Sequence, residues 1–209
     1  MKEHAKTAQR LTDTDVAFTN DVRRSVLLAT YIRCWGMPMH RVLSRHRETG
    51  HVLEVYLFPS HEGVPLARLA TVGVSSHACP TGTLDKELLM VLPADLGGAT
   101  QDEVINFMLD IAAYAIHTRE DIGPPFTVPE TPLAPREWVP RALLVDQARG
   151  EPEELEEVEL GNSEVEVLWV IPIHASEYRF IKASGIDAFD ELANKSELSL
   201  VDIGRPPLV

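Results

Sequence analysis

The chain has 209 residues, of which 19 are Lys or Arg and 32 are Asp or Glu, so its formal net charge at pH 7 is −13. This balance argues against a nucleic-acid-binding surface and against binding to anionic membranes, and it leaves a basic protein partner open. The length allows one large or two small domains, and the lack of a linker favours one.

Cysteine content and the N-terminus indicate where the chain works. Two cysteines, Cys34 and Cys79, are too few for a disulfide framework, although the sequence allows a single disulfide bridge between them. The polar start MKEHAKTAQRLTDTD lacks the apolar core of a signal peptide, and the apolar run Ser25–Ile32 is too short to span a bilayer. We therefore expect a cytoplasmic protein.

The first predicted elements are a helix and a meander of strands. Residues 1–14 are expected to be mobile, and apolar residues at helical spacing predict a helix from about Asp15 to Cys34. The segments Arg41–Arg47 and His51–Phe58 then form a hairpin around a turn at 48–50. Leu66–Val74 returns as a third antiparallel strand.

A polar loop and a second helix follow. Ser75–Thr83 is the favoured functional loop of the chain, and it leads into a central strand at Glu87–Leu92. Thr100 and Glu103 have the spacing of a capping box, and the wide apolar stripe behind them predicts a helix to about His117.

The segment 123–140 is rich in proline, so it cannot be helix interior or central strand, and it should wrap over the surface. A strand is expected at Arg141–Asp146.

Residues 151–159 then hold six Glu in nine positions. The preferred interpretation is a solvated loop or a charge-protected edge strand, and the alternative is a docking surface for a basic partner. The docking candidates are Glu153, Glu154, Glu156 and Glu157.

Val165–Ile171 is apolar on both faces, which predicts a central strand with Trp169 in the core. Pro172 should end its pairing, and His174 stands where a helix cap would precede Glu177. Gly185 suits the end of that helix. Asp187 is expected to cap a second short helix, and the tail from Asp202 should be irregular.

No catalytic pattern is complete. Gly73-Val-Ser75 lacks the second glycine of a nucleophile elbow, and Ser75 is too close in sequence to His77 to favour a nucleophile and base pair. His77 and Cys79 lack the further ligands at the spacing that zinc requires. We expect no cofactor, no metal and no enzymatic activity.

Three stretches resemble the suppressor of fused (SUFU) family, specifically its single-domain bacterial members. They are Thr71-Val-Gly-Val-Ser75, Glu87-Leu-Leu-Met-Val-Leu-Pro-Ala94 and Leu168-Trp-Val-Ile-Pro-Ile-His-Ala-Ser-Glu-Tyr178. The resemblance implies one α/β (α+β) domain over 1–209, with a central mixed, largely antiparallel sheet flanked by helices. It also implies a non-enzymatic protein-binding role, and the bacterial members are similar to proteins proposed as immunity factors against toxins.

The favoured hypothesis is a cytoplasmic, immunity-like binding protein that occludes a basic toxin or effector. Its surface is either the acidic run or a groove formed by Ser75, His77, Trp169 and His174. One alternative is a metal-dependent or hydrolytic enzyme that uses His77, Cys79 and His174. Another is a structural oligomeric adaptor, and the sequence does not separate a monomer from a homodimer.

Overall fold

The computed structural model describes residues 13–45, 52–60, 63–79, 82–118, 123–161 and 163–209. Within these ranges an eight-stranded sheet has the order β1-β2-β3-β6-β10-β8-β7, with β9 also paired to β10. Its strands are β1 (His40–Arg45), β2 (Val52–Phe58), β3 (Leu66–Val72), β6 (Lys86–Pro93), β7 (Phe126–Val128), β8 (Ala142–Gln147), β9 (Glu157–Glu159) and β10 (Glu164–Ile173). A separate ribbon joins β4 (Ala78–Cys79) to β5 (Gly82–Thr83).

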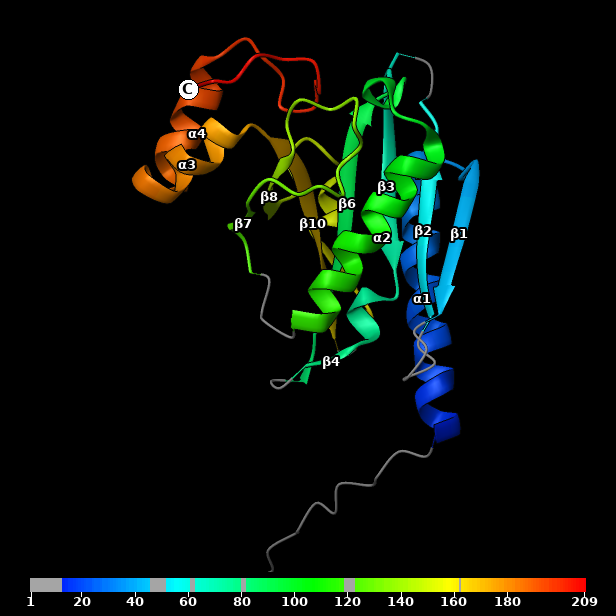
Figure 1. Ribbon diagram of the computed structural model, residues 1–209. Helices are drawn as coiled ribbons and strands as arrows, with labels where there is room; N and C mark the ends of the chain where they lie inside the picture. Colours follow the sequence, from blue (N-terminus) through cyan, green and yellow to red (C-terminus); the bar gives the residue numbers. More distant parts are fainter. Residues whose placement is uncertain (1–12, 46–51, 61–62, 80–81, 119–122, 162) are drawn as a thin grey trace, which may run out of the picture.

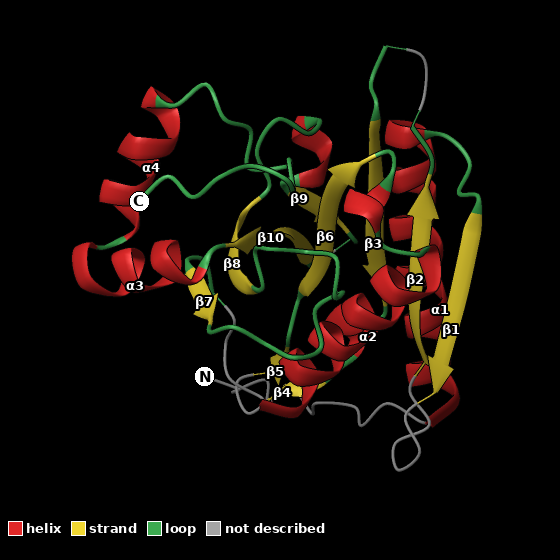
Figure 2. Cartoon of the chain, turned by 45° about the horizontal axis from the view of Figure 1, so that its top comes forward, coloured by secondary structure: helices red, strands yellow, loops and turns green. Residues whose placement is uncertain are grey.

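The helices are α1 (Asp13–Trp35), α2 (Gln101–Thr118), α3 (Ala175–Ser184) and α4 (Ile186–Lys195). Helix α2 packs on one face of the sheet, where Phe107 and Met108 meet the β2, β6 and β10 side chains. On the other face lie α1, α3 and α4 (Figures 1 and 2). The predicted fold class, a mixed and largely antiparallel sheet flanked by helices, is confirmed. No helix in the described ranges combines the length and apolarity that crossing a bilayer requires.

Strand β10 is central, as its two-sided apolar pattern predicts, with β6 parallel on one edge and β8 antiparallel on the other. The prediction that Pro172 ends its pairing is wrong, because Pro172 pairs with Leu143 and the strand continues to Ile173. Alternate residues of an antiparallel strand direct their N–H away from a given neighbour, so a proline fits at such a position. The β6 pairing has already ended at Trp169, which leaves that side free of a ladder at Pro172.

The predicted meander is present, since β1, β2 and β3 pair antiparallel in sequence order. The hairpin turn at 48–50 lies outside the described residues. Strand β3 ends two residues before the predicted Val74 because the chain turns at Gly73, where φ is +119°. A Cβ at Gly73 would lie 2.4 Å from the Val52 carbonyl oxygen, so only glycine fits there.

The capping box of α2 is confirmed. The Thr100 N–H donates to Glu103 at 2.9 Å, and the Glu103 N–H donates to the Thr100 hydroxyl at 3.3 Å. At α3 the N–H of the cap residue, His174, donates to Glu177 at 2.8 Å. The predicted cap at Asp187 is wrong, because α4 starts at Ile186 and its cap residue is Gly185, two residues before Asp187. The φ of +87° at Gly185 lets the two helices follow directly on each other.

The proline-rich segment 123–140 supplies the edge strand β7 and then crosses toward α2. Trp138 is only 2% exposed, stacks edge-on against Phe107 and donates its indole N–H to the Leu96 carbonyl at 3.0 Å. Trp138 therefore anchors the segment on the α2 side of the sheet.

Candidate functional site

The acidic run is built into the sheet beside β10. Glu166 pairs with both β6 and β9, so β9 and β8 lie on the same edge of β10. The chain leaves β8 at Gln147, makes an excursion over 148–156 and returns as β9 at Glu157. The run is thus both a loop and an edge strand, as the preferred interpretation predicts.

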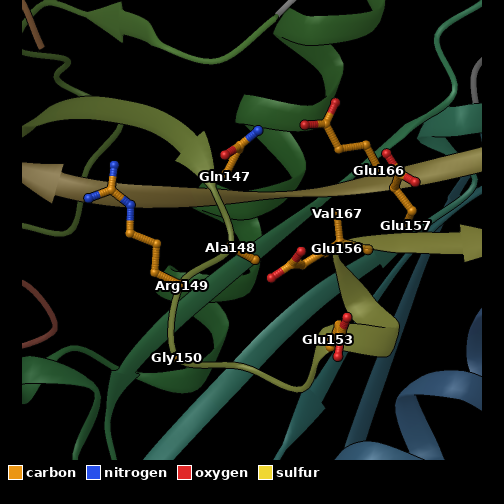
Figure 3. Close-up of a pocket in the computed structure, with 9 residues that line it drawn as sticks. All are labelled: Gln147, Ala148, Arg149, Gly150, Glu153, Glu156, Glu157, Glu166 and Val167. Carbon is orange, nitrogen blue, oxygen red and sulfur yellow. The ribbon is translucent and has the colours of Figure 1, made fainter. Parts of the chain in front are cut away.

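The excursion encloses a pocket of about 670 Å³, here called the acidic pocket (Figure 3). Its lining residues are Gln147, Ala148, Arg149, Gly150, Glu153, Glu156, Glu157, Glu166 and Val167. The single basic side chain among them is already matched, because Arg149 pairs with Asp146 and, at 3.0 Å, with Asp190 of α4. The four lining glutamates therefore give the pocket an excess of negative charge.

The pairing of β9 with β10 places glutamates directly opposite one another. Glu157 faces Glu166 and Glu159 faces Glu164, while the intervening Val158 and Val165 are buried on the other face. We call these four glutamates the acidic ladder. Like charges at opposed positions destabilise a hairpin, so each pair costs the free protein some stability. For Glu166 part of this cost is compensated, because Lys86 of β6 stands opposite it on its other side.

Neutralising one member of the ladder should therefore stabilise the free protein. We expect Glu157→Gln to raise the free energy of unfolding by about 0.5 kcal/mol, and added salt to raise it less in the variant than in the unmodified protein. Urea unfolding at two salt concentrations measures both effects. Glu191→Gln is the control, because Glu191 forms an attractive pair with Lys195 at 3.2 Å. A loss of stability in Glu157→Gln would contradict the repulsion.

One glutamate of the run is a buried anchor. Glu151 accepts hydrogen bonds from Arg68 at 2.8 and 2.9 Å and from the Trp35 indole at 2.7 Å, and its side chain is 5% exposed. Leu155, in the short 3₁₀ helix Glu153–Leu155, is fully buried. These contacts fix the excursion against the sheet and α1, so the pocket wall is positioned by the fold.

Glu154 points away from the acidic pocket. It accepts from the Cys34 thiol at 3.5 Å and lies 3.9 Å from Arg33, both on α1. Burial and the Glu154 carboxylate raise the pKa of Cys34 to about 11, so this thiol stays protonated at neutral pH. Of the four acidic candidates from the sequence, Glu153, Glu156 and Glu157 share the pocket and Glu154 does not.

The structure does not bring the other predicted site residues together. His77 precedes the start of β6, whereas His174 follows the end of β10. Since β6 and β10 are parallel neighbours, these two histidines lie at opposite ends of the sheet. Ser75, His77, Trp169 and His174 are all buried, with exposed fractions of 0, 6, 7 and 8%. They do not form one surface groove.

Their bonds are those of structural groups. The Ser75 hydroxyl donates to Glu87 at 2.7 Å, and His77 Nδ1 lies 2.8 Å from the Gly73 carbonyl. His174 Nε2 donates to the Arg205 carbonyl at 2.9 Å. The side chain of Cys79 lies outside the described residues. Among the residues that are described, no three His, Cys, Asp or Glu side chains converge as metal ligands.

The sequence did not reveal the cluster around Glu87, which is fully buried at the start of β6. Its carboxylate accepts from the Thr71 hydroxyl at 2.7 Å, from the Gly73 N–H at 2.9 Å and from the Ser75 N–H at 3.1 Å. A single acidic residue at the head of an apolar strand was the one signal along the chain. This cluster shapes the turn that connects β3 to the loop ahead of β6.

The sheet order and the placement of the helices define a mixed α/β domain with an acidic pocket beside β10. The sequence profile described as Suppressor of fused protein (SUFU) matches residues 50–206, and the chain belongs to this family. The predicted family is therefore confirmed, and membership fits a protein-binding module. A search of curated proteins finds no match.

Solved structures agree on the fold. A protein described as a SUFU homologue from Neisseria gonorrhoeae superposes with a TM-score of 0.67 at 17% identity, over 92% of this chain and 98% of that one. A chain of the Sufu–Fu complex gives 0.63 at 12% identity, over 91% and 92%. Drosophila Suppressor of Fused gives 0.63 at 13% identity over 88% of this chain, which spans half of the Drosophila chain.

Proposed function

We propose that this chain is a non-enzymatic binding protein that holds a basic protein partner at the acidic pocket and occludes it, as an immunity-like protein would occlude a toxin or effector. The observation that carries the proposal is that four glutamates, Glu153, Glu156, Glu157 and Glu166, line one pocket of about 670 Å³. Family membership supports protein binding, and one of the structurally similar chains is part of a Sufu–Fu complex.

Charge supplies the physical reason. A net charge of −13 steers a basic partner toward the protein over a distance of about a Debye length, roughly 8–10 Å at moderate salt. Of the acidic ladder, the opposed carboxylates of Glu157 and Glu166 line the pocket and are offered to a cation there. Binding a Lys or Arg side chain there would convert a repulsion into an attraction, so partner binding would be favoured beyond a simple surface ion pair.

The test starts from partner capture. The purified protein is immobilised, exposed to lysate of its own host at low and at high salt, and the bound proteins are identified by mass spectrometry. The captured partner is then titrated against Glu153→Gln/Glu156→Gln/Glu157→Gln. We expect affinity to fall about tenfold or more at low salt, because three partner charges lose their counter-charges.

A matched control separates the pocket from net charge. Glu130→Gln/Glu137→Gln/Glu191→Gln also removes three negative charges, but at exposed sites away from the pocket. We expect this control to bind within about twofold of the unmodified protein, since remote exposed charges contribute little to binding. Equal losses in both triple variants would show that binding follows net charge alone and would overturn the assignment of the pocket.

A further inference from the structure

A second surface lies on the other side of β9. The first half of α1 extends beyond the end of the sheet (Figure 1). Phe18 and Val22 lie in this half and Val26 follows one turn later, so the three repeat every four residues and share one helix face. Phe18 is 69% exposed and Val22 46% exposed, which is unusual for a helix that further along packs Leu27 and Tyr31 into the core.

This face forms one wall of a cavity of about 320 Å³, here called the α1 groove. The opposite wall is the turn between β9 and β10, with Glu159, Leu160 and Ser163. Arg23 lies in the groove, but its charge is matched by Asp85 at 2.9 Å and its second nitrogen donates to Ser163 at 3.2 Å. The groove is therefore apolar along its floor and carries the Glu159 carboxylate at its rim.

The α1 groove and the acidic pocket meet β9 two residues apart. Glu157 lines the pocket and Glu159 lines the groove, and both belong to the acidic ladder. On α1, Asp21 precedes Val22 but already pairs with Arg24 at 3.6 Å, so Glu159 is the negative charge that the groove offers a partner. One partner could therefore occupy both sites, with a cationic group in the pocket and an apolar element in the groove.

We propose that the α1 groove binds a short amphipathic, basic helix of the partner, with its apolar side chains against Phe18, Val22 and Leu160 and a Lys or Arg side chain beside Glu159. A helix fits because the apolar side chains of α1 follow a spacing of four residues over about 12 Å, which an incoming helix matches with its own i and i+4 positions. Charge selects this occupant over a second copy of the chain, since each copy carries −13.

The inference rests on the proposed function, because it gives the same basic partner a second contact. The probe is a stapled Lys/Leu amphipathic peptide of about three turns, and a Glu/Leu peptide of the same pattern is its charge control. Binding is followed by fluorescence anisotropy and mapped by amide chemical shifts on the ¹⁵N-labelled full chain. We expect shifts at residues 18–26, at 159–161 and at 163, and binding of the Glu/Leu peptide to be about tenfold weaker or more.

Phe18→Ser/Val22→Ser tests the apolar wall, and it should fold normally because both side chains are largely exposed. We expect it to bind the Lys/Leu peptide about tenfold or more weakly, because the buried apolar contact is lost. The matched control is Met37→Ser/Met39→Ser, which removes two apolar side chains of similar exposure, 70 and 61%, outside the groove. This control should bind as the unmodified protein does.

Each other outcome overturns the inference. Equal binding by both double variants would show that the groove takes no part. Shifts confined to the acidic pocket would do the same while leaving the proposed function intact. A dimer in light scattering that Phe18→Ser/Val22→Ser abolishes would assign the groove to a second copy. The proposed function is tested separately, by the affinity of the captured partner for Glu153→Gln/Glu156→Gln/Glu157→Gln and for its control.

Discussion

Glu177→Gln is expected to lower the free energy of unfolding by about 3 kcal/mol or more at neutral pH. The Glu177 carboxylate is fully buried and accepts from both terminal nitrogens of Arg205, at 2.5 and 2.8 Å. It also accepts from the His174 N–H at 2.8 Å and the Leu208 N–H at 2.9 Å. Glutamine keeps the shape but leaves the guanidinium, in a residue 2% exposed, without a counter-charge. Urea unfolding followed by circular dichroism measures the loss.

The loss should depend on pH in a defined direction. Burial alone would raise the pKa of Glu177, but the Arg205 guanidinium and the two backbone donors outweigh it and hold that pKa below its ordinary value of 4.5. A depressed folded pKa contributes stability that is present above the unfolded value and is lost as pH falls through the folded value. The difference between the two proteins should therefore be full at pH 7 and shrink as the pH falls below about 4.5.

Two variants test whether the ion pair itself is responsible. Glu191→Gln removes an exposed glutamate from the neighbouring helix and should change stability by less than about 0.5 kcal/mol. Glu177→Gln/Arg205→Met removes both buried charges, so it should be less destabilised than the sum of the single variants. Additive losses, or a difference that persists unchanged at low pH, would mean that the contacts around Glu177 and Arg205 stabilise the protein by packing alone.

The parts of the fold that sequence predicts well depend on neighbours along the chain. The capping box of Thr100 and Glu103 needs residues three apart, and the central position of β10 follows from apolar side chains on both faces of Val165–Ile171. Both are local patterns. The two wrong predictions, a helix cap at Asp187 and the end of strand pairing at Pro172, both concern the ends of elements. At an element end, a shift of one or two residues changes the assignment.

The candidate site was only partly predictable because its chemistry depends on distant partners. The sequence marks Glu153, Glu156 and Glu157 as acidic, yet nothing along the chain shows that β9 will set Glu157 against Glu166. From the sequence Glu151 is expected to be as solvated as its neighbours, but it is buried because it accepts a hydrogen bond from Arg68, 83 residues away. In the same way His77 and His174 are plausible partners by residue type, and the parallel pairing of β6 with β10 separates them.

Glu87→Gln is expected to lower the free energy of unfolding by about 3 kcal/mol, because it breaks the buried cluster around the β3 turn. One oxygen accepts from the Gly73 N–H and from the N–H and hydroxyl of Ser75, and the other accepts from the Thr71 hydroxyl. An amide group replaces one acceptor by a donor, so at least one set of donors would face another donor in the interior. Thermal and urea unfolding measure the change.

The neighbouring variants give a graded scale for this effect. Ser75→Ala removes one donor and leaves the carboxylate in place, so we expect a loss of about 1 kcal/mol. Glu164→Gln, on the exposed acidic ladder, should move stability the opposite way because it relieves repulsion from Glu159. Equal effects at Glu87 and Glu164 would mean that burial and hydrogen bonding do not distinguish the two glutamates.

Glu87 also connects stability to the proposed binding surface. Arg23 donates to the Ser75 carbonyl at 3.3 Å, to Asp85 at 2.9 Å and to the Ser163 hydroxyl at 3.2 Å, so the turn that Glu87 holds is linked to α1 and to the end of the β9–β10 hairpin. Native-state hydrogen exchange of Glu87→Gln should therefore show lost protection at Gly73 and Ser75 and also around Ser163. Protection lost at the turn alone would show that the α1 groove is positioned independently of this cluster.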